Sequence, residues 1–71
     1  MGCAIRNRIR ELRAAHGEMT QQALADRIGV TRQTVNAIEL GKYSPTLEMA
    51  FRIAAVFGVP LDAVFQFDGT V

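Results

Sequence analysis

The sequence predicts an all-α fold made of five short helices. Apolar residues recur at intervals of three and four, which is the spacing of one face of a helix. Glycines and capping threonines separate these periodic segments from one another. No stretch alternates between apolar and polar residues strongly enough to predict a strand, and the nearest approach is Val-Phe-Gln-Phe at residues 64–67.

The first two helices are delimited by glycines. The first is expected to end at Gly17, and its buried face, spaced i, i+4 and i+7, is Ile5, Ile9 and Leu12. The second follows the N-cap Thr20 and ends at Gly29. Its buried stripe is formed by Leu24, Ala25 and Ile28.

Three more helices follow. Two of them are capped by threonines and closed by glycines, and they lie between Thr31 and Gly41 and between Thr46 and Gly58. Their inward-facing residues at helical spacing are Val35, Ile38, Leu47, Ala50, Ile53, Ala54 and Phe57. Pro60 suits the start of a short fifth helix, which is predicted over Leu61 to Phe65.

Length and composition bound the class of protein. Seventy-one residues with 49% hydrophobic side chains suit one folded domain over residues 1–71. The chain has no apolar run of about 20 residues and no signal-peptide pattern at its start. Its one cysteine, Cys3, can form no internal disulfide, so we expect a cytoplasmic protein.

The two ends of the chain differ in charge. Residues 1–45 contain seven basic and four acidic side chains, for a net charge of +3. Residues 46–71 contain one basic and three acidic side chains, for a net charge of −2. This polarity would orient a small domain toward a polyanion.

Catalysis, metal binding and cofactor binding find no support in the sequence. It contains no Ser/His/Asp or Cys/His set, no glycine-rich phosphate loop and no convincing pair of carboxylates. The one histidine, His16, suits the negative end of a helix dipole better than a metal site. We therefore expect no enzyme, no metal and no cofactor.

The link between the second and third helices is only three residues long, Gly29-Val30-Thr31. So short a link brings the two helices into close contact at a steep angle, which is the helix-turn-helix arrangement. Ala25 is small enough to let the third helix approach, and Gly29 can adopt the positive φ of the turn.

This arrangement and its flanking segments resemble the XRE family, the helix-turn-helix regulators similar to phage repressors and Cro. The matching residues within the helix-turn-helix are Gln21, Ala25, Gly29, Val35 and Ile38. The similarity covers residues 5–65 and includes "NRIREL", "GVTRQTVNAIELGKYSPTLEMA" and "FGVPLDAVF". The segment "HGEMTQ" has one residue more than relatives often have, Glu18 or Met19, and the tail 66–71 lies outside the pattern.

The resemblance implies that the third helix lies in the major groove of B-DNA, with its first residues against base edges. Arg32 can donate two hydrogen bonds to guanine O6 and N7, and Gln33 can pair with adenine N6 and N7. The candidate base-contacting residues are Arg32, Gln33, Thr34, Asn36 and Ala37. The alternative is that the first three are ordinary solvent-facing residues of a capped helix.

The resemblance also implies phosphate contacts, from the start of the second helix and from residues just after the third. The candidate phosphate-contacting residues are Gln21, Thr31, Lys42 and Tyr43. Tyr43 alternatively covers the edge of the core. In relatives the residues equivalent to Arg13 and Glu39 pair with each other, so a structural ion pair is expected here.

Family members commonly bind near-palindromic sites as two-fold dimers. The predicted dimer interface consists of Leu61, Val64, Phe65 and Phe67, which are more apolar than a short helix and tail require. The alternative is that these residues are buried within the monomer. We expect a repressor that binds double-stranded DNA as a homodimer, and the alternative is a protein-interaction or antitoxin-like module with a protein partner.

Overall fold

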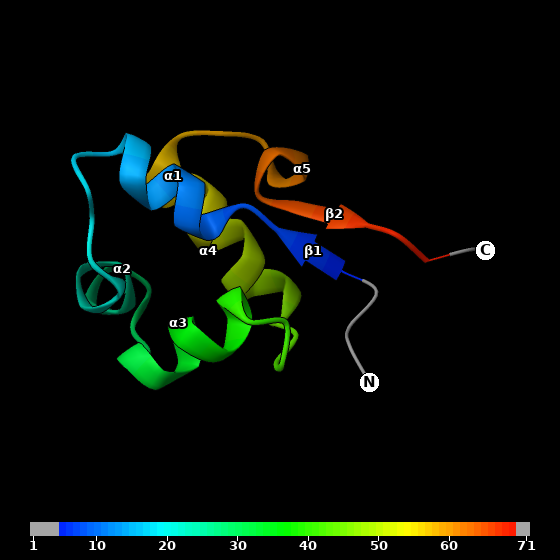
Figure 1. The fold of residues 1–71 in the computed structure, drawn as a ribbon, viewed down its shortest axis with the longest axis horizontal. Helices are drawn as coiled ribbons and strands as arrows, with labels where there is room; N and C mark the ends of the chain where they lie inside the picture. Colours follow the sequence, from blue (N-terminus) through cyan, green and yellow to red (C-terminus); the bar gives the residue numbers. More distant parts are fainter. Residues whose placement is uncertain (1–4, 70–71) are drawn as a thin grey trace.

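The computed structural model describes residues 5–69, which form five helices and one small sheet (Figure 1). The elements in chain order are β1 (Ile5–Asn7), α1 (Ile9–Ala15), α2 (Gln21–Ile28), α3 (Arg32–Glu39), α4 (Leu47–Phe57), α5 (Leu61–Val64) and β2 (Phe65–Phe67). The predicted helical fold with five short helices is confirmed. No helix within residues 5–69 has the length and apolar character that crossing a membrane requires.

The prediction that Ile5 belongs to the first helix is wrong. Residues 5–7 form β1, which pairs antiparallel with β2, so that Ile5 lies opposite Phe67 and Asn7 lies opposite Phe65. The pairing joins the two ends of the described chain, and the local spacing of apolar residues cannot reveal it. Because β2 begins at Phe65, the fifth helix ends at Val64, one residue earlier than predicted.

The core lies where the five helices meet, and each helix contributes at least one buried apolar side chain. The buried cluster is Ile9, Leu24, Ala25, Ile28, Val35, Ile38, Ile53, Ala54, Phe57 and Val64. Met19 and Met49 are partly buried and pack against it. Complete burial of an aliphatic side chain stabilises the fold by about 1.5–3 kcal/mol, so this cluster holds α3 against the other helices.

The connection between α1 and α2 contains two successive left-handed residues. Gly17 has a φ of 72° and Glu18 a φ of 54°, and Glu18 is the one non-glycine residue with positive φ within residues 5–69. The backbone N–H of Met19 then donates to the carbonyl oxygen of Arg13 at 2.9 Å. This bond holds the loop against α1 just before α2 begins.

Candidate nucleic-acid interface

The turn between α2 and α3 has the predicted tight geometry. Gly29 has a φ of 76°, and the backbone N–H groups of Gly29 and Val30 donate to the carbonyl oxygen of Ala25 at 2.9 and 3.0 Å. These bonds satisfy the last turn of α2 and end the helix. Ala25 is fully buried, which allows the close approach of α3.

Thr31 starts α3 directly after this turn. Its side-chain oxygen accepts a hydrogen bond from the backbone N–H of Thr34 at 3.2 Å, and the two hydroxyl oxygens lie 3.0 Å apart. A cap of this kind contributes about 1 kcal/mol to helix stability. The hydroxyl of Thr34 therefore supports the start of the helix, while Thr31 itself stays exposed.

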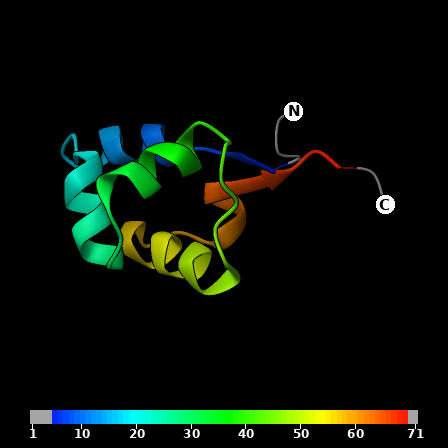
Figure 2. The same cartoon turned by 90° about the horizontal axis from the view of Figure 1, so that it is seen from below.

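The first two residues of α3 face solvent. Arg32 and Gln33 are exposed, and neither side chain forms a hydrogen bond or ion pair within residues 5–69. The opposite side of the helix is anchored by Val35 and Ile38, which are buried. In the view from below, no other element crosses in front of α3 (Figure 2). The first turn of α3 is therefore accessible to a large ligand.

The other candidate contact residues are placed further along the same segment. Asn36 and Ala37 are half-buried on α3. Lys42 is exposed just after the helix, and its backbone N–H donates to the carbonyl oxygen of Ala37 at 2.9 Å. Tyr43 is 46% exposed and lines a small cleft together with Phe65.

Arg13 and Glu39 form an ion pair between α1 and the last turn of α3. The Nε of Arg13 lies 2.7 Å from Oε2 of Glu39, and a second guanidinium nitrogen lies 3.0 Å from Oε1. The remaining guanidinium nitrogen of Arg13, Nη1, donates to the carbonyl oxygen of Met19 at 2.8 Å. The Glu39 side chain is only 8% exposed, so this carboxylate is paired with Arg13 in a nearly buried position.

Gln21 lies at the start of α2, and its side chain turns toward α3. Its Nε2 donates to Oδ1 of Asn36 at 3.1 Å and to Oε1 of Glu39 at 3.2 Å. An amide nitrogen carries two hydrogens, so both side-chain donors of Gln21 are used within the protein. Its backbone N–H belongs to the helix start, where the dipole favours anions.

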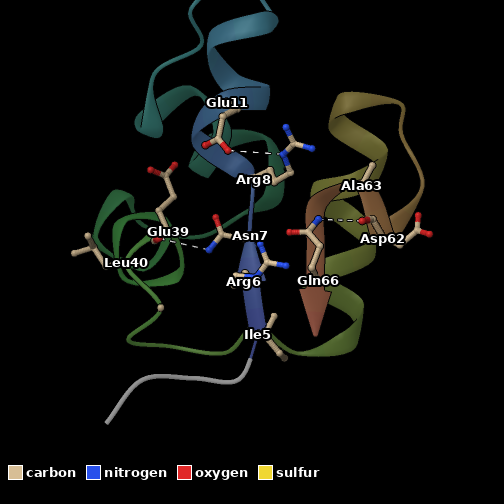
Figure 3. Close-up of a pocket in the computed structure, with 11 residues that line it drawn as sticks. Ile5, Arg6, Asn7, Arg8, Glu11, Glu39, Leu40, Asp62, Ala63 and Gln66 are labelled. Atoms are coloured by element: carbon tan, nitrogen blue, oxygen red, sulfur yellow. Dashed lines mark hydrogen bonds and ion pairs between the residues drawn. The ribbon is translucent and has the colours of Figure 1, made fainter. Parts of the chain in front are cut away.

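A contact that sequence reasoning missed holds the last turn of α3. The Nδ2 of Asn7 donates to the carbonyl oxygen of Ile38 at 3.0 Å. It also lies 3.5 Å from the carbonyl oxygen of Glu39, and Figure 3 marks this second contact with a dashed line. The Oδ1 of Asn7 accepts from the backbone N–H of Ile9 at 3.2 Å. An asparagine that accepts from the backbone N–H two residues later is a local turn signal, but the contact of Asn7 with Ile38 depends on β1 lying beside α3.

The predicted dimer residues do not share one environment. Val64 is fully buried in the core, so its assignment to a dimer interface is wrong. Leu61 and Phe65 are half-buried, and Phe67 is 61% exposed. Together with Ile5 these three residues line an open, mostly apolar groove between α5 and the sheet. The two strands whose residues line this groove lie at the end of the molecule away from α2 (Figure 1).

Comparison with known proteins agrees with this geometry. The family model described as Helix-turn-helix (HTH_3) matches residues 9–64. A protein of Archaeoglobus fulgidus named as an HTH-type transcriptional regulator is 48% identical over 64 residues, which cover 90% of each chain. The cryptic phage CTXphi transcriptional repressor RstR of Vibrio cholerae is 38% identical over 55 residues, or 78% of this chain and 49% of RstR.

The fold also has a solved counterpart. A crystal structure of a protein from Bacteroides fragilis matches this chain with a TM-score of 0.75. The match covers 87% of this chain and 98% of the other, at 24% sequence identity. At that identity the likeness shows that the two proteins share a fold.

Proposed function

Because the chain belongs to the XRE-type helix-turn-helix family, we propose that it is a cytoplasmic repressor that recognises a specific sequence in double-stranded DNA. Family membership makes it a transcriptional regulator with a DNA-binding domain and not an enzyme. In this proposal α3 enters the major groove, where Arg32 and Gln33 read base edges. Thr34, Asn36 and Ala37 contribute from the next positions of the helix.

The observation that carries the proposal is the exposure of the first turn of α3. Arg32 and Gln33 are both exposed at the positive end of the helix dipole. The last turn of the same helix is held by Arg13, through Glu39, and by Asn7. A helix that is held at one end and polar and open at the other suits groove reading. The similarity to RstR, which is named a repressor, supports repression.

Contacts with the phosphate backbone would flank this reading turn. Thr31 and Lys42 are exposed on either side of α3, and Tyr43 is partly exposed next to Lys42. The backbone N–H groups at the starts of α2 and α3 add partial positive charge. Contacts of this kind set the position of the protein on the duplex and carry no sequence information directly.

The repressor is proposed to act as a homodimer through the groove lined by Ile5, Leu61, Phe65 and Phe67. Phe67 is 61% exposed on the wall of this groove, so the Phe67 of each copy can contact the groove of the other. Such reciprocal contact is what a two-fold interface requires. A dimer of this class reads two half-sites about 34–36 Å apart, so the operator would be near-palindromic.

Selection from a random pool of DNA duplexes tests the proposed function. The wild-type chain is expected to enrich one near-palindromic sequence. The double variant Arg32→Ala, Gln33→Ala is the matched control, because both side chains are exposed and their loss leaves the core intact. Equal enrichment by the wild-type protein and this variant would contradict the assignment of α3 as the reading helix.

A salt titration separates DNA binding from the alternative of a protein-interaction module. Each phosphate neutralised on B-DNA contributes a slope of about −0.9 to log K against log[salt]. A DNA-binding repressor is therefore expected to lose affinity steeply between low and moderate salt. A module that acts only on a protein partner would show neither enrichment of a DNA sequence nor this slope.

A further inference from the structure

A chain of hydrogen bonds joins α1, α2 and α3 beneath the proposed reading face. Arg13 donates two hydrogen bonds to the carboxylate of Glu39, at 2.7 and 3.0 Å. The Nε2 of Gln21 donates to the same carboxylate at 3.2 Å and to Oδ1 of Asn36 at 3.1 Å. Asn36 lies one helical turn after Arg32 and therefore on the same side of α3. The chain of bonds thus ends on a candidate base-reading side chain.

The charge of Glu39 sets the direction of every bond in this chain. A carboxylate only accepts hydrogen bonds, so the atom of Gln21 that faces Glu39 must be its NH₂ group. The same nitrogen offers its second hydrogen to Asn36, which must present Oδ1. Turning either amide around would bring donor against donor or acceptor against acceptor. Asn36 is therefore held with its oxygen toward Gln21, and its NH₂ group has no partner within residues 5–69.

We propose that Gln21 is a positioning residue that orients Asn36 for base reading, and that its side chain is not a phosphate contact. The inference rests on the proposed entry of α3 into the major groove. Both hydrogens of the Gln21 amide are already used. Its remaining oxygen is an acceptor, and an ionised phosphate diester in DNA has no hydrogen to donate.

The held orientation predicts which bases Asn36 accepts. In the major groove, guanine, adenine and thymine each offer at least one acceptor, whereas cytosine offers only its N4 amino donor. If the NH₂ group of Asn36 faced that amino group, two donors would meet and neither would have an acceptor. Such an arrangement is costly in a desolvated contact. Cytosine is therefore the base that Asn36 excludes most strongly at the position it contacts.

The variant Gln21→Met tests the proposal. Methionine keeps the length of the side chain and removes both donors, so Asn36 becomes free to turn its oxygen toward the groove. Preferences are measured by selection from a random duplex pool, and the position at which Asn36→Ala abolishes preference identifies the base that Asn36 contacts. At that position Gln21→Met is expected to reduce discrimination against cytosine about fivefold or more. The slope of log K against log[salt] is expected to stay unchanged.

Gln22→Met is the matched control. Gln22 is the next residue of α2, it is exposed, and its Nε2 donates to Asp26 on the same helix at 2.8 Å. Its replacement is expected to leave the preference at the Asn36 position as in the wild-type protein. An equal relaxation in both variants would overturn the inference, because it would trace the effect to α2 in general.

Other outcomes contradict the inference directly. If Gln21→Met weakens binding to all sequences alike and reduces the salt slope by about 1, Gln21 is a phosphate contact. An unchanged preference at the Asn36 position also overturns the proposal. Failure of the wild-type protein to enrich any sequence is a separate result, and it would overturn the proposed function itself.

A second variant keeps the test open if Gln21→Met does not fold. In Asn36→Asp, the new carboxylate can still accept from Gln21 but offers only acceptors to the groove. The preference at this position is therefore expected to move toward cytosine, whose amino group donates. Retention of the wild-type preference in Asn36→Asp would overturn the inference.

Discussion

Asn7 and Ile38 are joined by a hydrogen bond of 3.0 Å from the side-chain amide of the first to the backbone carbonyl oxygen of the second. The bond ties β1 to the last turn of α3, where the carbonyl oxygen of Ile38 also accepts from the backbone N–H of Gly41 at 3.1 Å. The first turn of α3 has no such restraint from the sheet, and its side chains at Arg32 and Gln33 are exposed. The proposed reading helix is thus held at one end and open at the other.

Replacing Asn7 is expected to destabilise the fold. Asn7→Ala removes the bond to Ile38 and the acceptor for the backbone N–H of Ile9, so the free energy of unfolding should fall by about 1–3 kcal/mol. Urea titration measures this change. Arg8→Ala is the control, because Arg8 is exposed and its side chain forms a loose ion pair, with 3.8 Å between its Nε and Oε2 of Glu11. Its effect should not exceed about 0.5 kcal/mol, and equal losses would contradict the linking role of Asn7.

Removal of Arg13 is expected to leave the carboxylate of Glu39 unpaired in a nearly buried position. Arg13→Met should therefore lower the free energy of unfolding by about 3 kcal/mol, as measured by urea titration. Arg52→Met breaks a comparable pair with Glu48, whose two side chains are 57% and 75% exposed, and should cost no more than about 0.5 kcal/mol. Similar small losses in both variants would show that the Arg13 pair contributes no more than a surface pair.

His16 joins the ends of two helices. Its ring nitrogens lie 2.9 Å from the carbonyl oxygen of Leu12 and 3.1 Å from that of Phe57, and its ring packs 5.1 Å from the Phe57 ring. His16→Ala is expected to lower the free energy of unfolding by about 1–2 kcal/mol. His16→Phe keeps the ring contact and removes the polar ring nitrogens, so a smaller loss of unfolding free energy is expected than for His16→Ala. Thermal unfolding of the two variants tests this order, which a reversed ranking would refute.

Arg32 and Lys42 are expected to affect DNA binding in different ways. Arg32→Ala should relax the preference at one base position and cost about 1–3 kcal/mol on the preferred site. Lys42→Ala should weaken binding to all sequences alike and reduce the salt slope by about 1. Binding isotherms on the selected site and on single-base variants measure both effects. Uniform weakening by Arg32→Ala would rule out its role in base reading.

Phe67 is expected to control the oligomeric state. Phe67→Ser removes the exposed ring beside the groove of Leu61 and Phe65, and sedimentation should show a shift from dimer to monomer at tens of micromolar. Phe51→Ser is the matched control, because Phe51 is 54% exposed but lies on α4, outside the groove. A wild-type protein that sediments as a monomer, or a mass unchanged by Phe67→Ser, would contradict the proposed interface.

Features with short-range signals were predictable from the sequence. Thr20, Thr31 and Thr46 each accept a hydrogen bond from a backbone N–H three residues later, as N-caps do. Gly29 and Gly58 end their helices in the left-handed conformation. Each signal acts within about one turn of the chain, so reading along the sequence is enough to find it.

Features that depend on distant partners were not predictable in the same way. Ile5 fits the helical spacing of Ile9 and Leu12, yet its backbone pairs with Phe67 at the other end of the described chain. Val64 of the predicted fifth helix and Phe67 of the tail read alike as apolar residues, and only packing separates the buried one from the exposed one. The sheet also brings Ile5 into the groove proposed as a dimer interface.

The sequence by itself determined the five helices, the tight turn at Gly29 and the polar first turn of α3, because capping and helical periodicity operate between near neighbours. Tertiary structure alone decided that Gln21 directs its donors toward Asn36 and Glu39, and that Asn7 holds the far end of α3. Those choices depend on the free energy of contacts between separate helices and strands, and such contacts leave no periodic pattern along the chain.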